Sequence, residues 1–525
     1  MLKFSSLIKM STLTITVLIL SLSCSKKIHY PTDVEKSLEA SEANRKELEV
    51  VLDYFASWND TLKIKAAYYL IGNMQNHCYA IFGLFDSTGR KIEFDATAYK
   101  TFEDLENGFD SLQTLFGELD FKRDTLVYDL QIVEADFLIN QIDFAFQAWR
   151  TKPWAAGLSF ANFLEYVLPY RGSNEPLEPW REYFWEKYRA LDTLIQDVTD
   201  PIEAAKFVND DIKTWFAFDP RYYYHPTDQG LAEMLKSHYG RCEDMTNLTI
   251  YGMRTIGLAV TSDYTPYWAN AGGNHAWNAL VLKNDEVIPF MGAESNPGDY
   301  HLPNKMAKVY RKMYAEQTGN LAFQKNKQEK VPGWLAGKSY IDVTLSYTNA
   351  CDVVVNFEKA VPDSVDYAYL CVFNSGEWQA IDWGKIIGDS ARFSKIGVGI
   401  AYLPALYLNE EIVPYGSPFI LQDDCTMEYL KADLARARMI DLTSTTQRKL
   451  EVATDGVHKQ PLQTGVEYEL FYWLDQWQSV GKQKADKQGL SFANVPEGCL
   501  YWLVTDSSDK DERIFTLDNG LQIWW

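Results

Sequence analysis

Cys242 is the residue best placed in this sequence to do chemistry. It follows a Gly-Arg step in GRCEDMTNLTIYGMRTIGL, residues 240–258, where apolar residues recur at helical spacing. The pattern predicts a helix that begins at Cys242, with the thiol on its packed face. The unpaired N–H groups at a helix start stabilise a thiolate and lower the cysteine pKa, which favours a nucleophile. A packing role is the alternative, because cysteines on apolar helical faces are common in protein cores.

His275 is the matching candidate for a base. It stands in GGNHAWNALVLKNDEVIPF, residues 272–290, after two glycines and before an apolar run. The pattern predicts a strand that begins at His275, a turn centred between Asn284 and Asp285, and a returning strand. An imidazole at the mouth of this hairpin could accept a thiol proton, or it could be a hydrogen-bonded structural residue.

Together the two stretches resemble the transglutaminase-like superfamily of papain-type thiol enzymes over about residues 205–300. The order agrees: a cysteine that heads a helix, a strand in AVTSDYTPYW, and a histidine strand in NHAWNALVL. The resemblance implies an α+β core in which Cys242 is the nucleophile and His275 takes its proton and delivers it to the leaving amine. It also implies amide cleavage or exchange through a thioester, with the Cys242 backbone N–H as one oxyanion donor.

The third catalytic residue departs from the family pattern. Relatives carry an Asp shortly after a Pro on the strand that follows HAW, and alignment by Pro289 puts Met291 there. Counting an antiparallel ladder back from the predicted turn sets Glu294 opposite His275, where its carboxylate could orient the imidazole. Asn278 or another amide is one alternative, and the absence of any third residue is the other.

Three residues near this pair are expected to border the substrate cleft. The resemblance implies this for Trp277, nearness in sequence suggests it for Trp268, and Asn274 beside His275 is included with them. Core packing is an equal alternative for the two tryptophans. The turn-rich stretch FDPRYYYHPTDQG, residues 218–230, is a candidate rim of the same cleft.

The rest of the chain predicts the domains that flank this core. We interpret residues 24–200 as a helical domain, because apolar side chains around residues 138–149 recur on one helical face. Residues 201–325 are the predicted transglutaminase-like core. The chain then becomes strand-like, and we expect β modules at 326–440 and 441–525. The predicted fold class is therefore multidomain α+β.

The two β modules are internal copies of each other. Matching residues recur at an offset of 99 positions without a gap: Tyr369 and Tyr468, Trp378 and Trp477, Phe393 and Phe492, Ile396 and Val495, Gly399 and Gly498, Tyr402 and Tyr501. Such self-similarity indicates tandem modules that each keep a Trp and a Phe in the core. Exposed aromatics of the modules could instead bind sugar or peptide.

Composition argues against several partners and cofactors. The formal net charge of −22 speaks against nucleic acid, which needs clustered Lys and Arg. The cysteines show no CxxC pair and no metal-ligand spacing, so we expect no metal and no cofactor. Exported proteins can form disulfides, but the spacing assigns no pair, and we expect the cysteines after Cys24 to be unpaired.

The first 23 residues are typical of an export signal. Two lysines precede an apolar stretch, and LSLSC resembles the lipobox of bacterial lipoproteins, although Ser21 stands where an aliphatic residue is usual. Their removal deletes two lysines and no acidic residue, so the net charge changes from −22 to −24. We expect an envelope protein anchored to the membrane by a lipid on Cys24 and exposed to the periplasm or cell surface. Ordinary signal cleavage is the alternative.

These observations give two main hypotheses about function. The first is an envelope-anchored thiol enzyme that hydrolyses, or exchanges, amide bonds of a peptide, protein or glycopeptide. The second is an inactive transglutaminase-like scaffold that binds glycan or peptide, which Met291 at the family's Asp position supports. A third hypothesis, in which the β modules carry the function, is weaker because their matching aromatics fit a core equally well.

Overall fold

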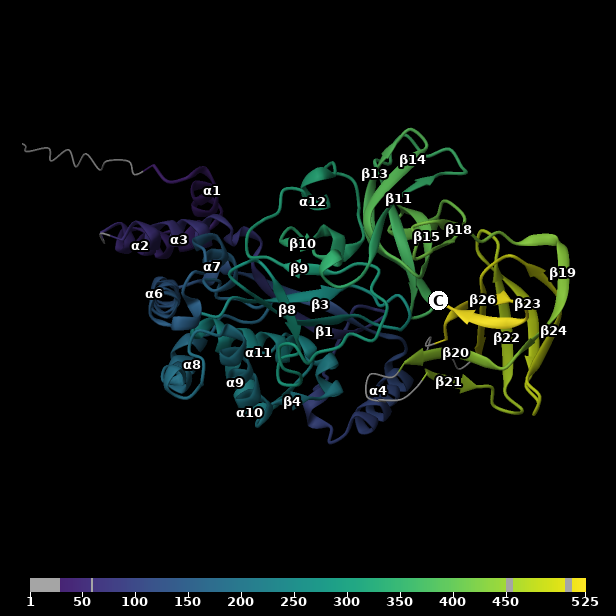
Figure 1. Cartoon of the computed structure of the whole chain (residues 1–525), viewed down its shortest axis with the longest axis horizontal. Coiled ribbons are helices and arrows are strands. Elements are labelled where there is room, and N and C mark those ends of the chain that lie inside the picture. Colours follow the sequence, from purple (N-terminus) through teal and green to yellow (C-terminus); the bar gives the residue numbers. More distant parts are fainter. Residues whose placement is uncertain (1–28, 58–59, 450–456, 506–511) are drawn as a thin grey trace, which may run out of the picture.

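The N-terminal region is largely helical. The computed structural model describes residues 29–57, 60–449, 457–505 and 512–525. Figure 1 shows most of its helices gathered at one end of an elongated molecule, with α4 nearer the middle. The helices of this region are α1 (Thr32–Ala40), α2 (Arg45–Ala56), α3 (Thr61–Gly72), α4 (Phe102–Phe116), α5 (Asp129–Ile132), α6 (Ala135–Thr151), α7 (Phe160–Tyr166) and α8 (Trp180–Tyr188). Leu138 and Ile142 of α6 are fully buried, as the helical spacing predicted.

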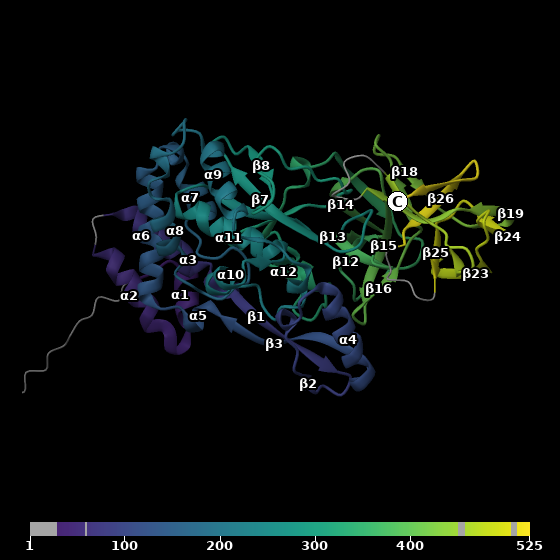
Figure 2. The same ribbon diagram turned by 90° about the horizontal axis from the view of Figure 1, so that it is seen from below.

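A three-stranded antiparallel sheet lies within this helical region and was not evident from the sequence. Its strands are β2 (Lys91–Ile92), β1 (Cys78–Asp86) and β3 (Leu119–Tyr128), with β1 in the centre. Figure 2 shows the sheet and α4 extending away from the helical body. The rings of Phe109 and Phe121 both contact Tyr224, and the Phe82 N–H donates to the Pro226 carbonyl at 2.8 Å. The sheet therefore packs against the segment just ahead of α11 (Cys242–Thr255).

The central region is a five-stranded sheet covered by α11. The strand order is β10 (Tyr340–Asp342), β9 (Tyr310–Lys312), β6 (Val260–Thr265), β7 (His275–Val281) and β8 (Val287–Phe290). The other elements are α9 (Pro201–Lys213), α10 (Leu231–Ser237), α12 (Leu321–Gln324) and the parallel pair β4 (Ala217–Phe218) and β5 (Tyr239–Gly240). The helix begins at Cys242 and the histidine strand at His275, as predicted from the sequence.

Two antiparallel β modules follow. Module 1 contains β11 (Ala350–Asn356), β12 (Tyr367–Asn374), β13 (Glu377–Ile387), β14 (Ser390–Gly397), β15 (Ile400–Leu408), β16 (Glu411–Pro414), β17 (Phe419–Leu421) and β18 (Met427–Tyr429). Module 2 contains β19 (Asp433–Leu442), β20 (Ser444–Lys449), β21 (Val457–Pro461), β22 (Glu467–Trp473), β23 (Trp477–Lys484), β24 (Leu490–Glu497), β25 (Tyr501–Thr505), β26 (Ile514–Asp518) and β27 (Leu521–Trp524). In Figure 1, module 1 lies between the core and module 2.

The internal repeat is confirmed in three dimensions. The Tyr402 hydroxyl donates to the Gly397 carbonyl at 2.6 Å, and its copy Tyr501 donates to the Pro496 carbonyl at 2.5 Å. Each hydroxyl therefore fixes the same corner between equivalent strands. The repeated phenylalanines occupy separate cores, as expected. The repeated tryptophans do not, because Trp378 and Trp477 meet in one aromatic cluster where the modules join.

Two domain edges differ from the expected ones. β10 pairs with β9, so the core sheet continues past residue 325. β19 begins at Asp433 and pairs with β24, so module 2 begins before residue 441. A strand of three residues such as β10 carries too little periodic signal to be placed from sequence.

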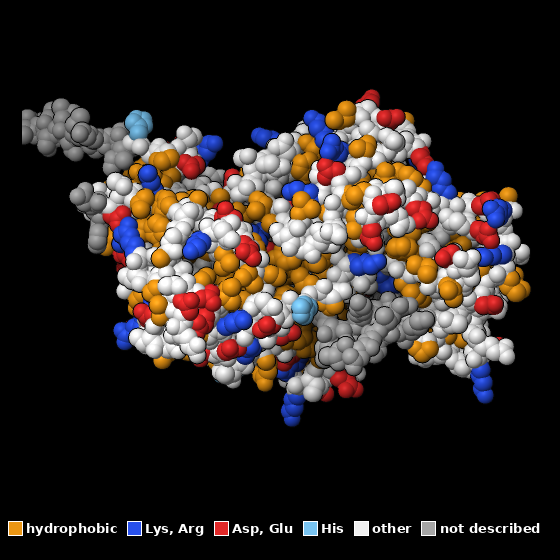
Figure 3. Space-filling view, viewed as in Figure 1, with side chains coloured by type: hydrophobic (Ala, Val, Ile, Leu, Met, Phe, Trp, Pro, Cys, Tyr) orange, Lys and Arg blue, Asp and Glu red, His pale blue; other side chains and the backbone are white. Residues whose placement is uncertain are grey.

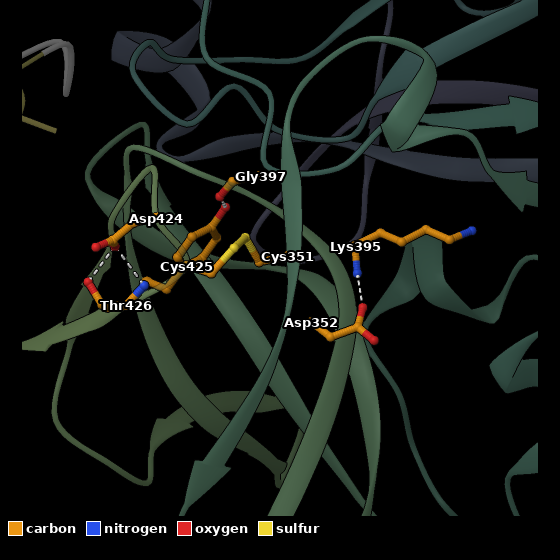
Figure 4. Close-up of a disulfide and its surroundings, with 8 residues drawn as sticks. Cys351, Asp352, Lys395, Gly397, Asp424, Cys425 and Thr426 are labelled. Carbon is orange, nitrogen blue, oxygen red and sulfur yellow. Dashed lines mark hydrogen bonds between the residues drawn. A yellow bond between two sulfur atoms is a disulfide. The ribbon is translucent and has the colours of Figure 1, made fainter.

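A disulfide joins Cys351 and Cys425, which corrects the expectation of unpaired cysteines. Their Cα atoms lie 5.8 Å apart although 74 residues separate them in sequence. Figure 4 shows the bridge between β11 and the turn that precedes β18. The cysteine spacing could not predict this pair, because the two residues are brought together by strand pairing between segments far apart in the sequence. The free thiols among the described residues are Cys78, Cys242, Cys371 and Cys499.

The export prediction lies outside the part of the chain that the structure describes, because residues 1–28, including Cys24, are not among those residues. Within the described part, no helix combines the length and apolarity that crossing a bilayer requires. On the face seen in Figure 3, acidic, basic and apolar side chains are interspersed over the helical region and the modules.

Candidate functional site

The start of α11 is fixed by a buried carboxylate. Asp244 accepts the backbone N–H of Arg241 at 2.9 Å and that of Gln229 at 2.8 Å. It thus ties the residue ahead of the helix to the first turn, as in a capping box. Burial, with a contribution from the nearby charge of Asp228, raises the pKa of Asp244 to about 6. The position of Cys242 is therefore set by one hydrogen bond within the sequence GRCED and by a second from the backbone of Gln229.

The Cys242 thiol lies against the beginning of β7. Its side chain is only 4% exposed, and the backbone N–H of Ala276 faces the sulfur. Ala276 directly follows His275. The predicted nucleophile and the predicted base therefore come from adjoining positions where the helix start meets the strand start.

Strand pairing explains why the sulfur fits at this point. The Val281 N–H donates to Ala259, ahead of β6, so by alternation the Ala276 N–H points to the opposite edge of β7, the β8 side. β8 ends at Phe290, which pairs with Asn278. Cys242 thus takes the place beside Ala276 where β8 no longer pairs.

The resting thiol has a raised pKa, opposite to the direction predicted from the helix start. Burial is the largest cause. The Glu243 carboxylate is the next, because the Cys242 thiol donates to its Oε2 at 3.0 Å. The Ala276 N–H and the Arg241 charge act in the other direction without outweighing these effects. The sequence argument considered the helix N–H groups and left out the neighbouring carboxylate.

The His275 ring is held by aromatic neighbours and by Tyr300. Trp268 stacks on it at 5.8 Å between ring centroids, and Trp277 lies at 5.9 Å. The Nε2 atom lies 2.6 Å from the Tyr300 hydroxyl. If Nε2 carries the proton and donates it to Tyr300, Nδ1 is the unprotonated ring nitrogen, as a base requires. Sequence reasoning missed Tyr300, because it stands in a loop that has no periodic pattern.

The ladder count that led to Glu294 does not match the observed register. The hairpin turn is centred on Asn284, and pairing ends where Asn278 meets Phe290. Extending this register past the end of β8 would place residue 293, and not residue 294, opposite His275. Glu294 lies exposed in the turn that follows β8. Its role as the orienting carboxylate stays a prediction.

Asn278, the alternative for the third position, and Met291, which occupies the family's Asp position, both have structural roles. The Asn278 amide is fully buried, donates to the Thr246 carbonyl at 3.1 Å and accepts the Gly292 N–H at 3.0 Å. It therefore joins α11 to the turn after β8. Met291, at the family's Asp position, is 2% exposed and belongs to the hydrophobic core of this region.

A cavity of about 670 Å³ is lined by sequence neighbours of the two candidate catalytic residues, although neither Cys242 nor His275 lines it. Asn274 lines it next to His275, and Glu243 and Tyr223 line it next to Cys242. The opposite wall comes from β1 and β3, including Phe82 and Arg123. The predicted rim at 218–230 contributes Tyr223, His225, Thr227 and Asp228. The N-terminal sheet and the core thus enclose the cavity together.

The cleft residues expected from the sequence separate into two groups. Asn274 faces the cavity, whereas Trp268 and Trp277 are 4% and 0% exposed and pack against His275. The Tyr223 hydroxyl lies beside the Cys242 thiol, and burial together with that sulfur raises the pKa of Tyr223. Tyr223 therefore covers the thiol on the cavity side.

Both β modules hold the loop that leads to His275. Asn374, at the end of β12, is 2% exposed. Its amide nitrogen donates at 2.9 Å to each of three loop carbonyls, those of Trp268, Ala271 and Gly273. Its oxygen accepts the Gly273 N–H at 3.1 Å. Arg513 of module 2 donates to the Ala269 carbonyl at 2.6 Å. The loop conformation is therefore set from outside the core.

Comparisons with known proteins agree with this geometry for the core region. Residues 189–290 match the sequence model of the transglutaminase-like superfamily, which supports a papain-like fold there. No curated protein matches the sequence. Among solved structures, the chain is similar to the crystal structure of red sea bream transglutaminase, with 10% identity over 86% of this chain and 77% of that one, and a TM-score of 0.21. A superposition this weak carries no argument about the fold or the activity.

Proposed function

We propose that the protein hydrolyses or exchanges amide bonds of a peptide or glycopeptide, because residues 189–290 match the model of the transglutaminase-like superfamily, whose members are generally cysteine-based enzymes. The observation that carries the proposal is the Cys242 thiol facing the Ala276 N–H, one residue from His275. The adjacent cavity offers space for a substrate chain.

The proposed reaction has two halves. The Cys242 thiol gives its proton to His275 and its sulfur bonds to the amide carbon, so an oxyanion forms beside the N–H of Cys242 at the helix start. The C–N bond then breaks, and the leaving amine takes the proton from His275. Water, or a second amine, attacks the thioester, which releases an acid or a new amide and restores the thiol.

The geometry favours Tyr300 as the residue that orients His275 in this scheme. A hydrogen bond from Nε2 to the Tyr300 hydroxyl would fix the tautomer whose Nδ1 accepts the thiol proton. Because the resting thiol is neutral, the nucleophile forms by this proton transfer to His275. Glu294 is the rival orienting residue, as the sequence predicted.

The activity is tested by incubating the protein with envelope peptides and glycopeptides and measuring product masses. Hydrolysis gives two fragments whose masses together exceed the substrate by one water, whereas exchange gives an amine adduct. The Cys242→Ser protein is the matched control. Product formation that persists in Cys242→Ser would contradict the proposal.

An inert binding scaffold is the second candidate, because the thiol is buried and its pKa is raised. Such a scaffold predicts that Cys242 reacts with an alkylating probe no faster than the buried thiols of Cys371 and Cys499. The enzyme proposal predicts faster labelling that depends on His275.

For location, we propose a bacterial envelope lipoprotein with a lipid on Cys24. The disulfide between Cys351 and Cys425 supports an oxidising compartment. Labelled palmitate should enter the protein during expression in a bacterial host and should be absent from the Cys24→Ala variant. Equal label in both proteins would contradict the anchor.

A further inference from the structure

An aromatic groove of about 700 Å³ lies where the two β modules and the core meet. Its walls carry four tryptophans and two tyrosines: Trp334, Trp378, Trp473, Trp477, Tyr267 and Tyr407. It is separate from the cavity beside Cys242, and the proposed reaction does not use it.

Packing fixes these rings in place. Phe373 contacts Trp378 at 5.5 Å and Trp477 at 5.8 Å between centroids, so the two repeated tryptophans converge on one ring. The Trp334 indole donates to the Ala380 carbonyl at 2.8 Å. Trp334 and Trp477 nevertheless keep part of their surface uncovered. A rigid, partly uncovered ring is a preformed platform for a flat ligand face, because little side-chain entropy is lost on binding.

The polar groups of the groove are carboxylates and amides. Glu377, Glu410, Glu411, Gln379 and Gln476 line it. These carboxylates disfavour an anionic ligand. Carboxylate oxygens accept from hydroxyl groups, and the glutamine amides both donate and accept.

From this combination we infer that the groove binds a neutral glycan. A pyranose ring presents a C–H face that stacks on an indole and hydroxyl groups that donate and accept at its edge. A lysine side chain would suit the rings and carboxylates but would leave the N–H donors of the two glutamines without an acceptor, because an ammonium group only donates. The full set of polar groups therefore matches hydroxyls better than cations.

The groove also lies next to the loop that leads to His275. Tyr267 lines the groove and Asn274 lines the cavity beside Cys242. The Trp268 N–H donates to the Gly273 carbonyl at 3.1 Å, so the two ends of this loop lie side by side. If the proposed amide chemistry holds, a glycopeptide could place its sugar in the groove and its peptide in the cavity. This last step rests on the proposed function, whereas glycan binding itself does not.

Binding is best measured by calorimetry on the Cys242→Ser protein, with mannan, laminarin and chitohexaose as neutral probes. Heparin serves as the anionic probe and a lysine-rich peptide as the cationic one. We expect at least one neutral glycan to bind. Trp477→Ala should weaken that binding at least tenfold, and Tyr407→Ala and Glu411→Gln should each weaken it about threefold or more. Tyr429→Ala, a tyrosine of module 1 outside the groove, should bind as the parent does.

Three results would overturn the inference. One is the absence of binding by all three neutral glycans at millimolar concentration. The second is binding of heparin or the peptide alone. The third is glycan binding that survives both Trp477→Ala and Tyr407→Ala in proteins whose thermal unfolding is unchanged. If the Trp477→Ala protein does not fold, the glycan affinity of Glu411→Gln is the deciding measurement, because the exposed Glu411 side chain can be changed without disturbing the fold. Failure of the amide chemistry would leave these results untouched, since the Cys242→Ser protein performs none.

Discussion

Glu243 determines the resting state of the candidate nucleophile. Its carboxylate accepts a hydrogen bond from the Cys242 thiol at 3.0 Å. Burial is the largest cause of the raised thiol pKa, and the Glu243 charge is the second. Removing this charge in Glu243→Gln should lower the pKa and increase the thiolate fraction near neutral pH. We expect alkylation of Cys242 to become roughly tenfold faster, since one pKa unit changes the thiolate fraction about tenfold when the thiol predominates.

The control for this prediction is Glu233→Gln, whose carboxylate is half exposed and pairs with His225 rather than with the thiol. Its labelling rate should equal that of the parent. A Glu243→Gln protein that labels at the parental rate would show that Glu243 does not hold the thiol in its protonated form.

Tyr300 and Glu294 can be separated as orienting residues by paired variants. Tyr300→Phe removes the hydroxyl at 2.6 Å from His275 Nε2 and should lower kcat about tenfold or more with little change in KM, because a lost hydrogen bond costs about 1 to 3 kcal/mol. The pH profile of kcat should shift, since the imidazole loses its partner. Full activity in Tyr300→Phe with a loss in Glu294→Gln would instead assign the role to Glu294.

At the scale of elements, the loop between β6 and β7 is the link between the modules and the site. Asn374→Ala removes the side chain that contacts three loop carbonyls. We expect kcat to fall more than tenfold while product formation remains dependent on Cys242. Asn356→Ala, an exposed asparagine of module 1, is the control and should keep parental kinetics. Equal kinetics in the two variants would show that the loop keeps its conformation without the hydrogen bonds of the Asn374 side chain.

Protonation of Asp244 at the start of α11 should make the stability of the fold depend on pH. Its pKa in the folded protein is about 6, above the usual 3.8, so the stability that its protonated form contributes is present below about pH 4 and is lost as the pH rises through 6. The thermal unfolding midpoint of the parent relative to Asp244→Asn should therefore fall between pH 4 and pH 7. A constant difference across that window would mean that Asp244 does not titrate there.

The helix and strand that carry Cys242 and His275 were predictable from the sequence, but the long-range contacts that hold them in place were not. Cys242 and His275 each begin the element that local sequence predicted, because helix and strand starts leave periodic signals. Tyr300, Asn374 and the Cys351–Cys425 bridge left no such signal, since each acts across the chain through loops or strand pairing. The miscounted position of Glu294 came from a turn centred half a residue away from the assumed place.

At the scale of the whole molecule, the cavity of about 670 Å³ belongs to more than one domain. β1 and β3 of the N-terminal region form one wall, and the core supplies Glu243 and Asn274, the sequence neighbours of Cys242 and His275. The two modules fix the loop before His275 through Asn374 and Arg513. The transglutaminase-like region of residues 189–290 is therefore one part of a site that the flanking domains complete.

The central claim is that Cys242 and His275 share a proton, and the rate of Cys242 labelling by iodoacetamide at neutral pH tests it most directly. Buried Cys371 and Cys499 in the same molecule serve as internal standards. The account predicts that Cys242 labels faster than both and that His275→Ala slows its labelling at least tenfold. Labelling of Cys242 at the rate of the two standards, or at the same rate with and without His275, would contradict it.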